Sequence, residues 1–259
     1  MYASNYLENA FLNTLRGQNL NAPSKVYLGL FLSNPGEQGA GLEVNYQGYR
    51  RMAINFSAPA RVGSNTEISV AEDIKFAESN KALGTITHIA IFDSLTGGNC
   101  LAYGELTEEL TITTGESPAI FENDLKIYMT GADGLSNHYR DKLLNVFRAQ
   151  SIQGFQPYIA LFTGNSDAGG IELTGNSYTR KQVEFTAPEQ SATGQAVIKN
   201  TQKIKFNKPT TAWGNWASTV IMDAATNGNA VYKKSREMKE LKKGYVPYFE
   251  TNAIQVMIN

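Results

Sequence analysis

The sequence contains a tandem repeat, and this repeat restricts the possible folds of the chain more than any other feature. The segment from Ser4 to Arg16 returns as the segment from Ser136 to Arg148, at an offset of 132 residues. Later segments return in the same order at offsets of 129 to 131, so the copies differ by small loop insertions. A period near 130 residues is that of a whole domain, whereas solenoid and propeller units span roughly 20 to 50 residues. The sequence therefore predicts two homologous domains, residues 1–132 and 133–259.

Composition narrows the function classes. The chain has 259 residues, 18% of them charged, and a net charge of -1, which argues against disorder and against a nucleic-acid binder with a strongly basic surface. Cys100 is the single cysteine, so we expect a small buried side chain and neither an intramolecular disulfide nor a cysteine zinc site. A run of about 18 apolar residues and a signal-peptide pattern are both missing. We expect synthesis in a cytoplasm, no export by that route and no membrane partner.

The apolar pattern predicts the same elements in each copy. Apolar side chains at helical spacing predict a short amphipathic helix over residues 4–16, begun by Ser4 or Asn5, and a second helix after Ser136. Beyond each helix the period changes to two, which indicates about seven antiparallel strands per copy. The predicted fold is mainly β, with two tandem antiparallel β-sandwich domains, jelly-roll-like, each opening with a short helix. The pattern leaves the strand order open.

Residues suited to catalysis neither cluster in the sequence nor recur convincingly. His88 aligns with Ser218 and His138 with Tyr6, so neither histidine is shared between the copies. The aligned acids lie in a loop, a turn and a strand start: Glu43 with Glu172, Asp93 with Asp223, and Glu122 with Glu250. Structural roles in turns and at the surface suit these positions better than the role of the paired catalytic carboxylates of a glycosidase does. We predict no enzyme activity, no catalytic or metal-binding residue and no cofactor.

The two copies differ in charge over one corresponding region. The first copy is acidic there and the second is basic: Glu105, Glu108, Glu109 and Glu116 against Lys233, Lys234, Arg236, Lys239, Lys242 and Lys243. Complementary patches steer and register association. The acidic edge of one subunit could therefore meet the basic edge of its neighbour, or the basic edge could meet another acidic partner. Independent drift of two solvated surfaces is the third interpretation. The candidate contact residues are Glu105, Glu108, Glu109, Lys233, Lys234, Arg236 and Lys239.

The order of these segments resembles that of a family of small bacteriophage virion proteins, the tail fibre or minor structural proteins. The segments are the opening SNYLENAFLNTL, the strand VYLGLFLSNPG, the stretch GLEVNYQGYRRMAINFSAP and the hairpin THIAIFDSLTGGNCLAYGEL. The resemblance covers Ser4 to about Met129, and the second copy departs from it at Trp213, Trp216 and the lysine-rich stretch. It implies a structural component of a tailed phage, made in the host cytoplasm and carried on the virion, without catalytic residues.

The residues and the resemblance together predict a non-enzymatic accessory or decoration protein on the exterior of the phage head or tail, held by contacts with capsid or tail subunits. A homo-oligomer is expected, with a trimer as one candidate, because three duplicated chains present six similar units. The alternative is a tail-fibre adhesin that binds host surface glycan. In that case Trp213 and Trp216 would stack on sugar rings. A place in the core is the other interpretation of both tryptophans, because they lead into an apolar strand.

Overall fold

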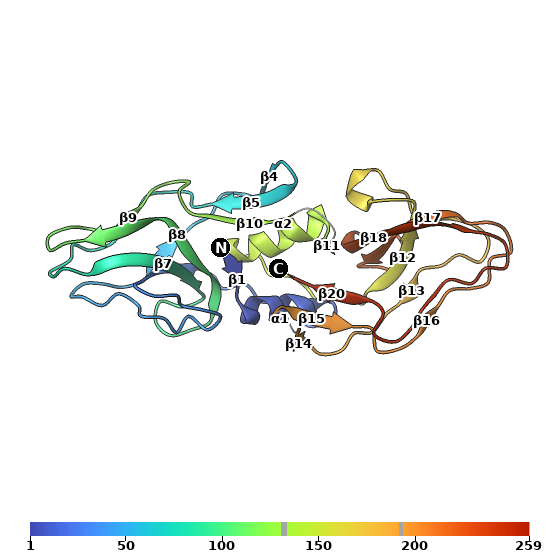
Figure 1. Cartoon of the computed structure of the whole chain (residues 1–259), viewed down its shortest axis with the longest axis horizontal. Helices are drawn as coiled ribbons and strands as arrows, with labels where there is room; N and C mark the ends of the chain where they lie inside the picture. The colour runs from blue at the N-terminus through green and yellow to red at the C-terminus, as the bar shows by residue number, and fades with distance from the viewer. Residues whose placement is uncertain (131–133, 192–193, 259) are drawn as a thin grey trace.

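The chain folds into two similar, mainly β halves that lie end to end (Figure 1). The structure is a computed structural model that describes residues 1–130, 134–191 and 194–258. The domain boundary predicted between residues 132 and 133 lies outside these described residues.

The first half contains one helix and ten strands, which are α1 (Asn5–Thr14), β1 (Tyr2–Ala3), β2 (Val26–Phe31), β3 (Met52–Ile54), β4 (Ala60–Val62), β5 (Asn65–Ser69), β6 (Ile74–Lys75), β7 (Gly84–Phe92), β8 (Cys100–Ile112), β9 (Ala119–Ile120) and β10 (Lys126–Met129). The sequence pattern indicated about seven strands. Three of the ten, β1, β6 and β9, are only two residues long, too short to show an alternation.

The second half repeats these elements in the same order. They are β11 (Gly134–Leu135), α2 (Asn137–Asn145), β12 (Tyr158–Phe162), β13 (Lys181–Gln182), β14 (Glu189–Gln190), β15 (Ala196–Lys199), β16 (Ile204–Lys205), β17 (Gly214–Met222), β18 (Ala230–Leu241), β19 (Tyr248–Phe249) and β20 (Gln255–Met257). Two 3₁₀ turns, η1 (Val146–Arg148) and η2 (Ser166–Ala168), are added.

Both halves have the same sheet topology. The strand orders are β1-β8-β7-β2-β3 and β11-β18-β17-β12-β13 in the five-stranded sheets, β10-β5-β4 and β14-β15-β20 in the three-stranded sheets, and β6-β9 and β16-β19 in the ribbons. The repeated order confirms a mainly β chain with two similar halves. A jelly-roll-like sandwich in each half stays a prediction, because each half divides its strands among sheets of five, three and two.

A serine begins each helix at the predicted place. The hydroxyl of Ser4 accepts a hydrogen bond from the backbone N–H of Leu7, and that of Ser136 does the same for Tyr139. Both serines are buried and also donate to the first residue of the long strand in their own half, Ser4 to the Cys100 carbonyl and Ser136 to that of Ala230. Each cap therefore ties a helix to the five-stranded sheet.

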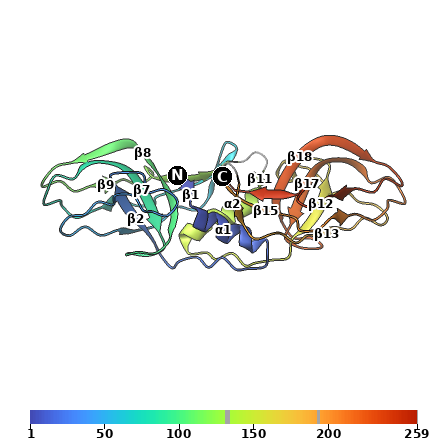
Figure 2. The same ribbon diagram turned by 60° about the horizontal axis from the view of Figure 1, so that its bottom comes forward.

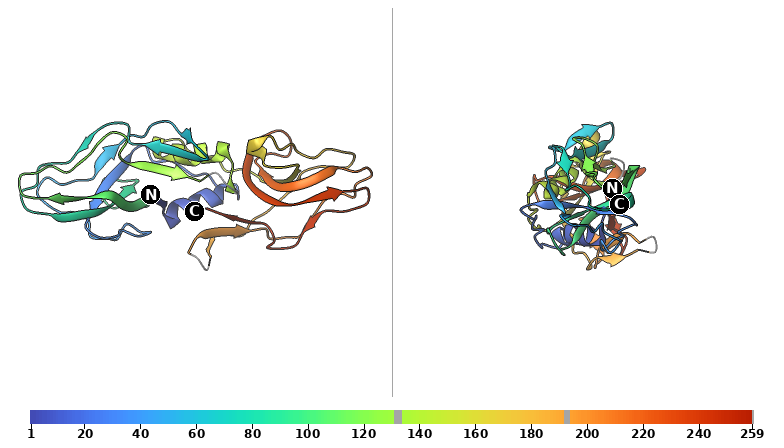
Figure 3. Two further views of the ribbon diagram at one scale, coloured as in Figure 1. Left: turned by 45° about the horizontal axis from the view of Figure 1, so that its top comes forward. Right: turned by 90° about the vertical axis from the view of Figure 1, so that its left-hand side faces the viewer.

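The two helices lie at the centre of the molecule and are exchanged between the halves (Figures 2 and 3). Helix α1 packs on β8 of its own half and on β15 of the other, while α2 packs on β18 of its own half and on β5 and β10 of the other. The ring of Phe11 on α1 meets the ring of Tyr139 on α2 edge-on, with centroids 6.2 Å apart. One continuous cluster of buried apolar side chains runs through both halves. The core therefore does not divide at the repeat boundary.

Polar contacts stabilise the exchanged helices at equivalent positions, where one copy has an acidic residue and the other a basic residue. Glu8 on α1 and Arg140 on α2 are 132 residues apart, and both are buried. The Glu8 carboxylate accepts from the backbone N–H of Ala196 at 3.1 Å, whereas the Arg140 guanidinium donates to the carbonyl of Ser64 at 2.9 Å. Each helix therefore has its own partner groups on the opposite sheet.

The segments that follow the helices cross at the centre of the molecule. Leu20 and Ile152, also 132 residues apart, exchange backbone hydrogen bonds of 2.8 and 2.9 Å. A pairing between equivalent residues places an approximate twofold axis between them. Close by, the backbone of Gly154 lies against that of Gly17, and a Cβ on Gly154 would stand 2.2 Å from the Gly17 carbonyl carbon.

We expect Gly154→Ala to destabilise the whole chain. The added methyl group meets backbone, which cannot move aside as a flexible side chain can, so the crossing must open at a cost of at least about 2 kcal/mol. Urea unfolding of the variant measures this loss. Gly164→Ala is the matched control, because a Cβ there has only an ordinary contact at 3.9 Å. Equal stability of the two variants would contradict the crossing.

Glu8 gives the exchanged interface a pH dependence. Burial raises the pKa of its carboxyl to about 7, although the Ala196 N–H opposes the rise, and the Glu37 carboxylate adds to it. In the unfolded chain a glutamate ionises near pH 4.3. The folded state therefore holds a proton that the unfolded state has released, and stability falls as the pH rises between these two values.

Glu8→Gln removes this titration and keeps an oxygen for the Ala196 N–H. Relative to the wild type, the variant should gain about 1 to 3 kcal/mol of stability between pH 4 and pH 8, since one pKa unit corresponds to about 1.4 kcal/mol. Urea unfolding at both pH values checks this gain, with the exposed Glu109 replaced by Gln as control. A stability difference that does not change with pH would contradict the buried titration.

Candidate functional site

The recurring charged residues form the same structural network in both halves. The Arg51 guanidinium pairs with the two carboxylate oxygens of Glu43 at 2.9 and 2.8 Å and donates to the carbonyl of Gly97, at 2.7 Å, in the turn between β7 and β8. The hydroxyl of Tyr49 contacts the same carboxylate and accepts from the N–H of Leu30. In the second half Arg180, Glu172 and Tyr178 repeat these contacts.

This network accounts for the polar residues that the repeat keeps. Burial raises the pKa of Tyr49 and of Tyr178, so these phenols stay protonated. The Asp93 carboxylate accepts from the backbone and side-chain nitrogens of Asn99, both at 2.7 Å, and so closes the turn. Asp223 does the same with Asn229. These residues hold loops in place and leave no acid and base facing a common substrate position.

The remaining reactive residues that the structure describes do not gather into a metal site. Within the described residues, no group of three or more histidine, cysteine or acidic side chains is arranged to hold a metal ion. None of the described helices combines the length and apolar character needed to cross a membrane. Cys100 is buried, and this burial raises the pKa of its thiol to about 12. Its thiolate is therefore scarce at neutral pH.

The acidic candidates lie on β8 and the basic ones on β18. Glu105, Glu108 and Glu109 are exposed on β8, as are Lys234, Arg236 and Lys239 on β18.

The structure corrects the assignment of Lys233 to a contact surface. Its side chain is 2% exposed, and the ammonium group pairs with the Asp167 carboxylate at 2.9 Å. In the first half the corresponding strand position is Tyr103, whose hydroxyl donates to Glu37. Lys233 therefore replaces an internal hydrogen bond with an internal ion pair.

Both tryptophans lie in the core, which confirms the structural interpretation of them. Trp213 is 4% exposed and Trp216 is 3% exposed. The Trp213 indole donates to the carbonyl of Asn176 and meets the rings of Tyr178 and Phe206 edge-on. The Trp213 ring is therefore too buried to stack on a sugar. The Trp216 indole donates to the Ser218 carbonyl, and the Arg236 guanidinium covers one face of its ring at 3.6 Å from the centroid.

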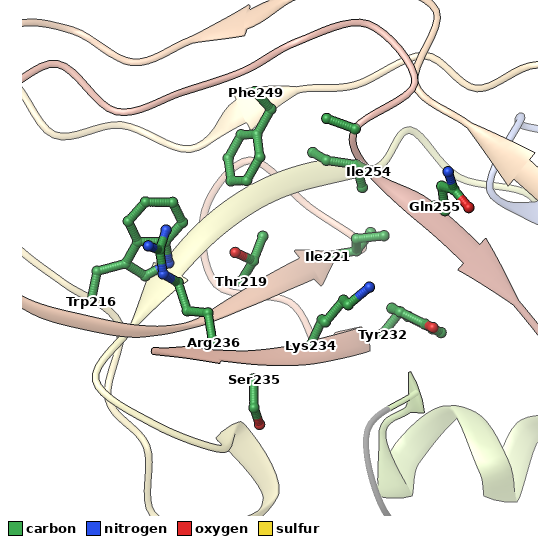
Figure 4. Close-up of a pocket in the computed structure, with 11 residues that line it drawn as sticks. Trp216, Thr219, Ile221, Tyr232, Lys234, Ser235, Arg236, Phe249, Ile254 and Gln255 are labelled. Carbon is green, nitrogen blue, oxygen red and sulfur yellow. The ribbon is translucent and has the colours of Figure 1, made fainter. Parts of the chain in front are cut away.

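Trp216 lies beside a hollow of about 200 Å³ in the second half, named here the Trp216 hollow (Figure 4). Its lining residues come from β17, β18, β19, the turn after β19 and the start of β20: Trp216, Thr219, Ile221, Tyr232, Lys234, Ser235, Arg236, Phe249, Ala253, Ile254 and Gln255. The rings and aliphatic groups form an apolar interior. Lys234 and Arg236 add cationic groups to it, and we call these two residues the basic rim.

Differences between the repeats explain how this hollow arises. Ile89 stands opposite Gly104 in the first half, and Thr219 stands opposite Lys234 at the same place in the second. Likewise, Arg236 in the second half corresponds to Leu106 in the first, one residue after Ser235 and Glu105. In the first half Ile89 is buried and Leu106 packs against the core. The second half therefore has a threonine and an arginine where the first half has two apolar core side chains. The threonine fills less volume than the isoleucine, and the arginine adds a charge.

Sequence reasoning found Trp216, Lys234 and Arg236 but missed the rest of the lining. In the sequence, Phe249 and Ile254 have the pattern of ordinary apolar strand and turn residues. The residues next to them in the chain give no indication that they face a hollow. The usable signal was Thr219 in place of Ile89, because a polar residue at a core position of the repeat marks altered packing.

The family model for podophage GP4 fiber I protein gp80 matches the chain twice, over residues 2–128 and over residues 134–257. The chain belongs to this family. No curated protein matches it.

Membership in the gp80 fibre family confirms the resemblance to phage fibre proteins and the tandem repeat of one module. The double match also covers the second half, including the tryptophans and the lysine-rich strand that depart from the pattern of the first. The chain is therefore a tail fibre-related structural component of a phage virion.

The contact between Arg236 and Trp216 gives a direct test of the hollow. Arg236→Ala uncovers one face of the indole, so the acrylamide quenching constant of the tryptophan fluorescence should rise. The variant should also lose the cation–π contact, worth about 0.5 to 1 kcal/mol. The exposed Lys205 replaced by Ala is the control. Unchanged quenching in Arg236→Ala would show that the guanidinium does not cover the ring in solution.

Proposed function

We propose that the chain is a non-enzymatic accessory or decoration protein on the exterior of a tailed phage, held on head or tail subunits by protein contacts. The observation that carries this proposal is the match of both halves to one phage fibre family. Synthesis in the host cytoplasm, before attachment to the particle, belongs to the same proposal.

The use of charged residues inside the fold supports this role. The ion pair of Arg51 with Glu43, and that of Arg180 with Glu172, both hold loops, as do the turn carboxylates. An enzyme needs ionisable groups that converge on a reacting atom, and the recurring groups point to the backbone of their own half. Charge is instead concentrated on exposed strands, where it can act on other proteins.

The exchanged helices suit an assembly part as well. Because each helix packs on the sheet of the other half, the two modules hold a fixed relation, and their outer ends present fixed surfaces. Homo-oligomerisation, with a trimer as one candidate, remains part of this proposal, as do sandwich-like modules with a boundary near residues 132 and 133.

The adhesin alternative now depends on residues other than the two tryptophans. Tyr245 and Tyr248 are 38% and 52% exposed and offer aromatic surface to a glycan. A lysine lies over each ring, Lys239 over Tyr245 at 4.0 Å and Lys203 over Tyr248 at 4.3 Å from the centroid. Each ring therefore has one covered face, and any sugar must use the other.

Particles of the virus that encodes the chain test the proposal. We expect peptides of the chain in gradient-purified infectious particles and antibody label on their exterior in electron micrographs. Absence of the chain from such particles would contradict a structural role. Calorimetric titration with host surface polysaccharide separates the alternative, because binding that is lost in a Tyr245→Ala, Tyr248→Ala variant would favour the adhesin.

A further inference from the structure

The long strands of the two halves carry opposite charge. On β8 and the turn after it, Glu105, Glu108, Glu109 and Glu116 give a charge of -4, because residues 100–117 contain no lysine or arginine. On β18 and the turn after it, Lys234, Arg236, Lys239, Lys242 and Lys243 stand against Glu237 and Glu240, which gives 5 - 2 = +3. The buried Lys233 is left out of this sum. The strands β8 and β18 lie in opposite halves of the elongated molecule (Figures 1 and 2).

Some of these charges are already paired and others are not. Lys242 pairs with Glu240 at 3.3 Å, and the ammonium of Lys239 contacts the hydroxyl of Tyr245. Within the part of the chain that the structure describes, neither residue of the basic rim forms an ion pair with a carboxylate, and neither do Glu105, Glu108 and Glu109. These three glutamates are named here the acidic strand. The surfaces with unpaired charge are therefore the acidic strand and the basic rim.

Within the basic rim, the side chain of Arg236 is held in place before any partner arrives. The guanidinium of Arg236 is held against the ring of Trp216 and donates from Nε to the carbonyl of Glu237 at 3.0 Å. A side chain that is already held loses less conformational entropy when a partner arrives. The neighbouring apolar hollow lowers the local dielectric, which strengthens the attraction of a carboxylate to this rim.

We propose that the acidic strand of one copy docks on the basic rim of a second copy, beside the Trp216 hollow, so that copies associate head to tail. The exchanged helices hold the two ends apart, so the acidic strand cannot reach the basic rim of its own chain. Since the two surfaces differ, the contact is heterologous, and repetition gives a ring or a row. This inference rests on the proposed role as an assembly part and names its partner as the chain itself.

Sedimentation of the purified full chain tests the contact. We expect concentration-dependent association in about 20 mM salt and its loss in about 500 mM salt, because the Debye length falls from roughly 20 Å to a few ångströms. Lys234→Glu with Arg236→Glu should weaken association at low salt at least about tenfold, since like charges then face each other. Lys25→Glu with Lys75→Glu is the control, with the same charge change at exposed positions that lie outside both β8 and β18.

A charge exchange distinguishes a lost contact from a lost fold. Glu108→Lys with Glu109→Lys should by itself weaken association, and mixing this variant with the Lys234→Glu, Arg236→Glu variant should restore a heterodimer through the reversed pair. Circular dichroism and the thermal midpoint of each variant confirm folding. A wild-type chain that stays monomeric at low salt overturns the proposal, and so does association that the rim variant leaves unchanged.

Failure of rescue on mixing also overturns it. These results are separate from the proposed virion role. Antibody labelling of particles decides the role, and a chain that is monomeric in solution can still be found on the particle.

Discussion

The exchange of the two helices is the packing interaction on which the rest of the structure depends. Helices of ten and nine residues are too short to be stable in water without a partner surface. Each finds two surfaces, the long strand of its own half and the three-stranded sheet of the other. The buried apolar cluster therefore extends across the molecule, and the three-stranded sheets are covered on one face by a helix from a distant part of the chain.

Duplication within one chain also lets the two sides of this interface differ. Two identical chains would place the same residue at both equivalent positions. Here Glu8 accepts from a backbone N–H while its counterpart Arg140 donates to a carbonyl, so each helix is matched to one sheet. The same freedom extends to the ends, where an acidic strand on one half corresponds to a basic rim on the other. A head-to-tail contact needs such a difference.

The halves remain alike where the backbone needs support and differ where the surface is free to change. The ion pair of Glu43 with Arg51 is kept as Glu172 with Arg180, because both guanidiniums also hold carbonyls of a hairpin turn. Gly98 and Gly228 are kept in those turns, where φ is +74° and +71° and a Cβ would lie 2.3 and 2.4 Å from the turn aspartate. The Trp216 hollow instead arises where Thr219 stands at the position of Ile89 in the first half. The second half accommodates this difference without a change in its strand order.

The sequence by itself determined the repeat, the helix starts at Ser4 and Ser136 and the mainly β class, because each depends on local spacing or on comparing one copy with the other. Only the tertiary structure decided which sheet each helix covers, since a repeated amphipathic pattern is satisfied equally by its own half or by the other. It also decided the burial of Lys233, because a lysine in a basic run gives no local sign that Asp167 lies opposite. The lining of the hollow required it too, since Phe249 belongs to a different sheet from Trp216 and the two meet only when the sheets pack together.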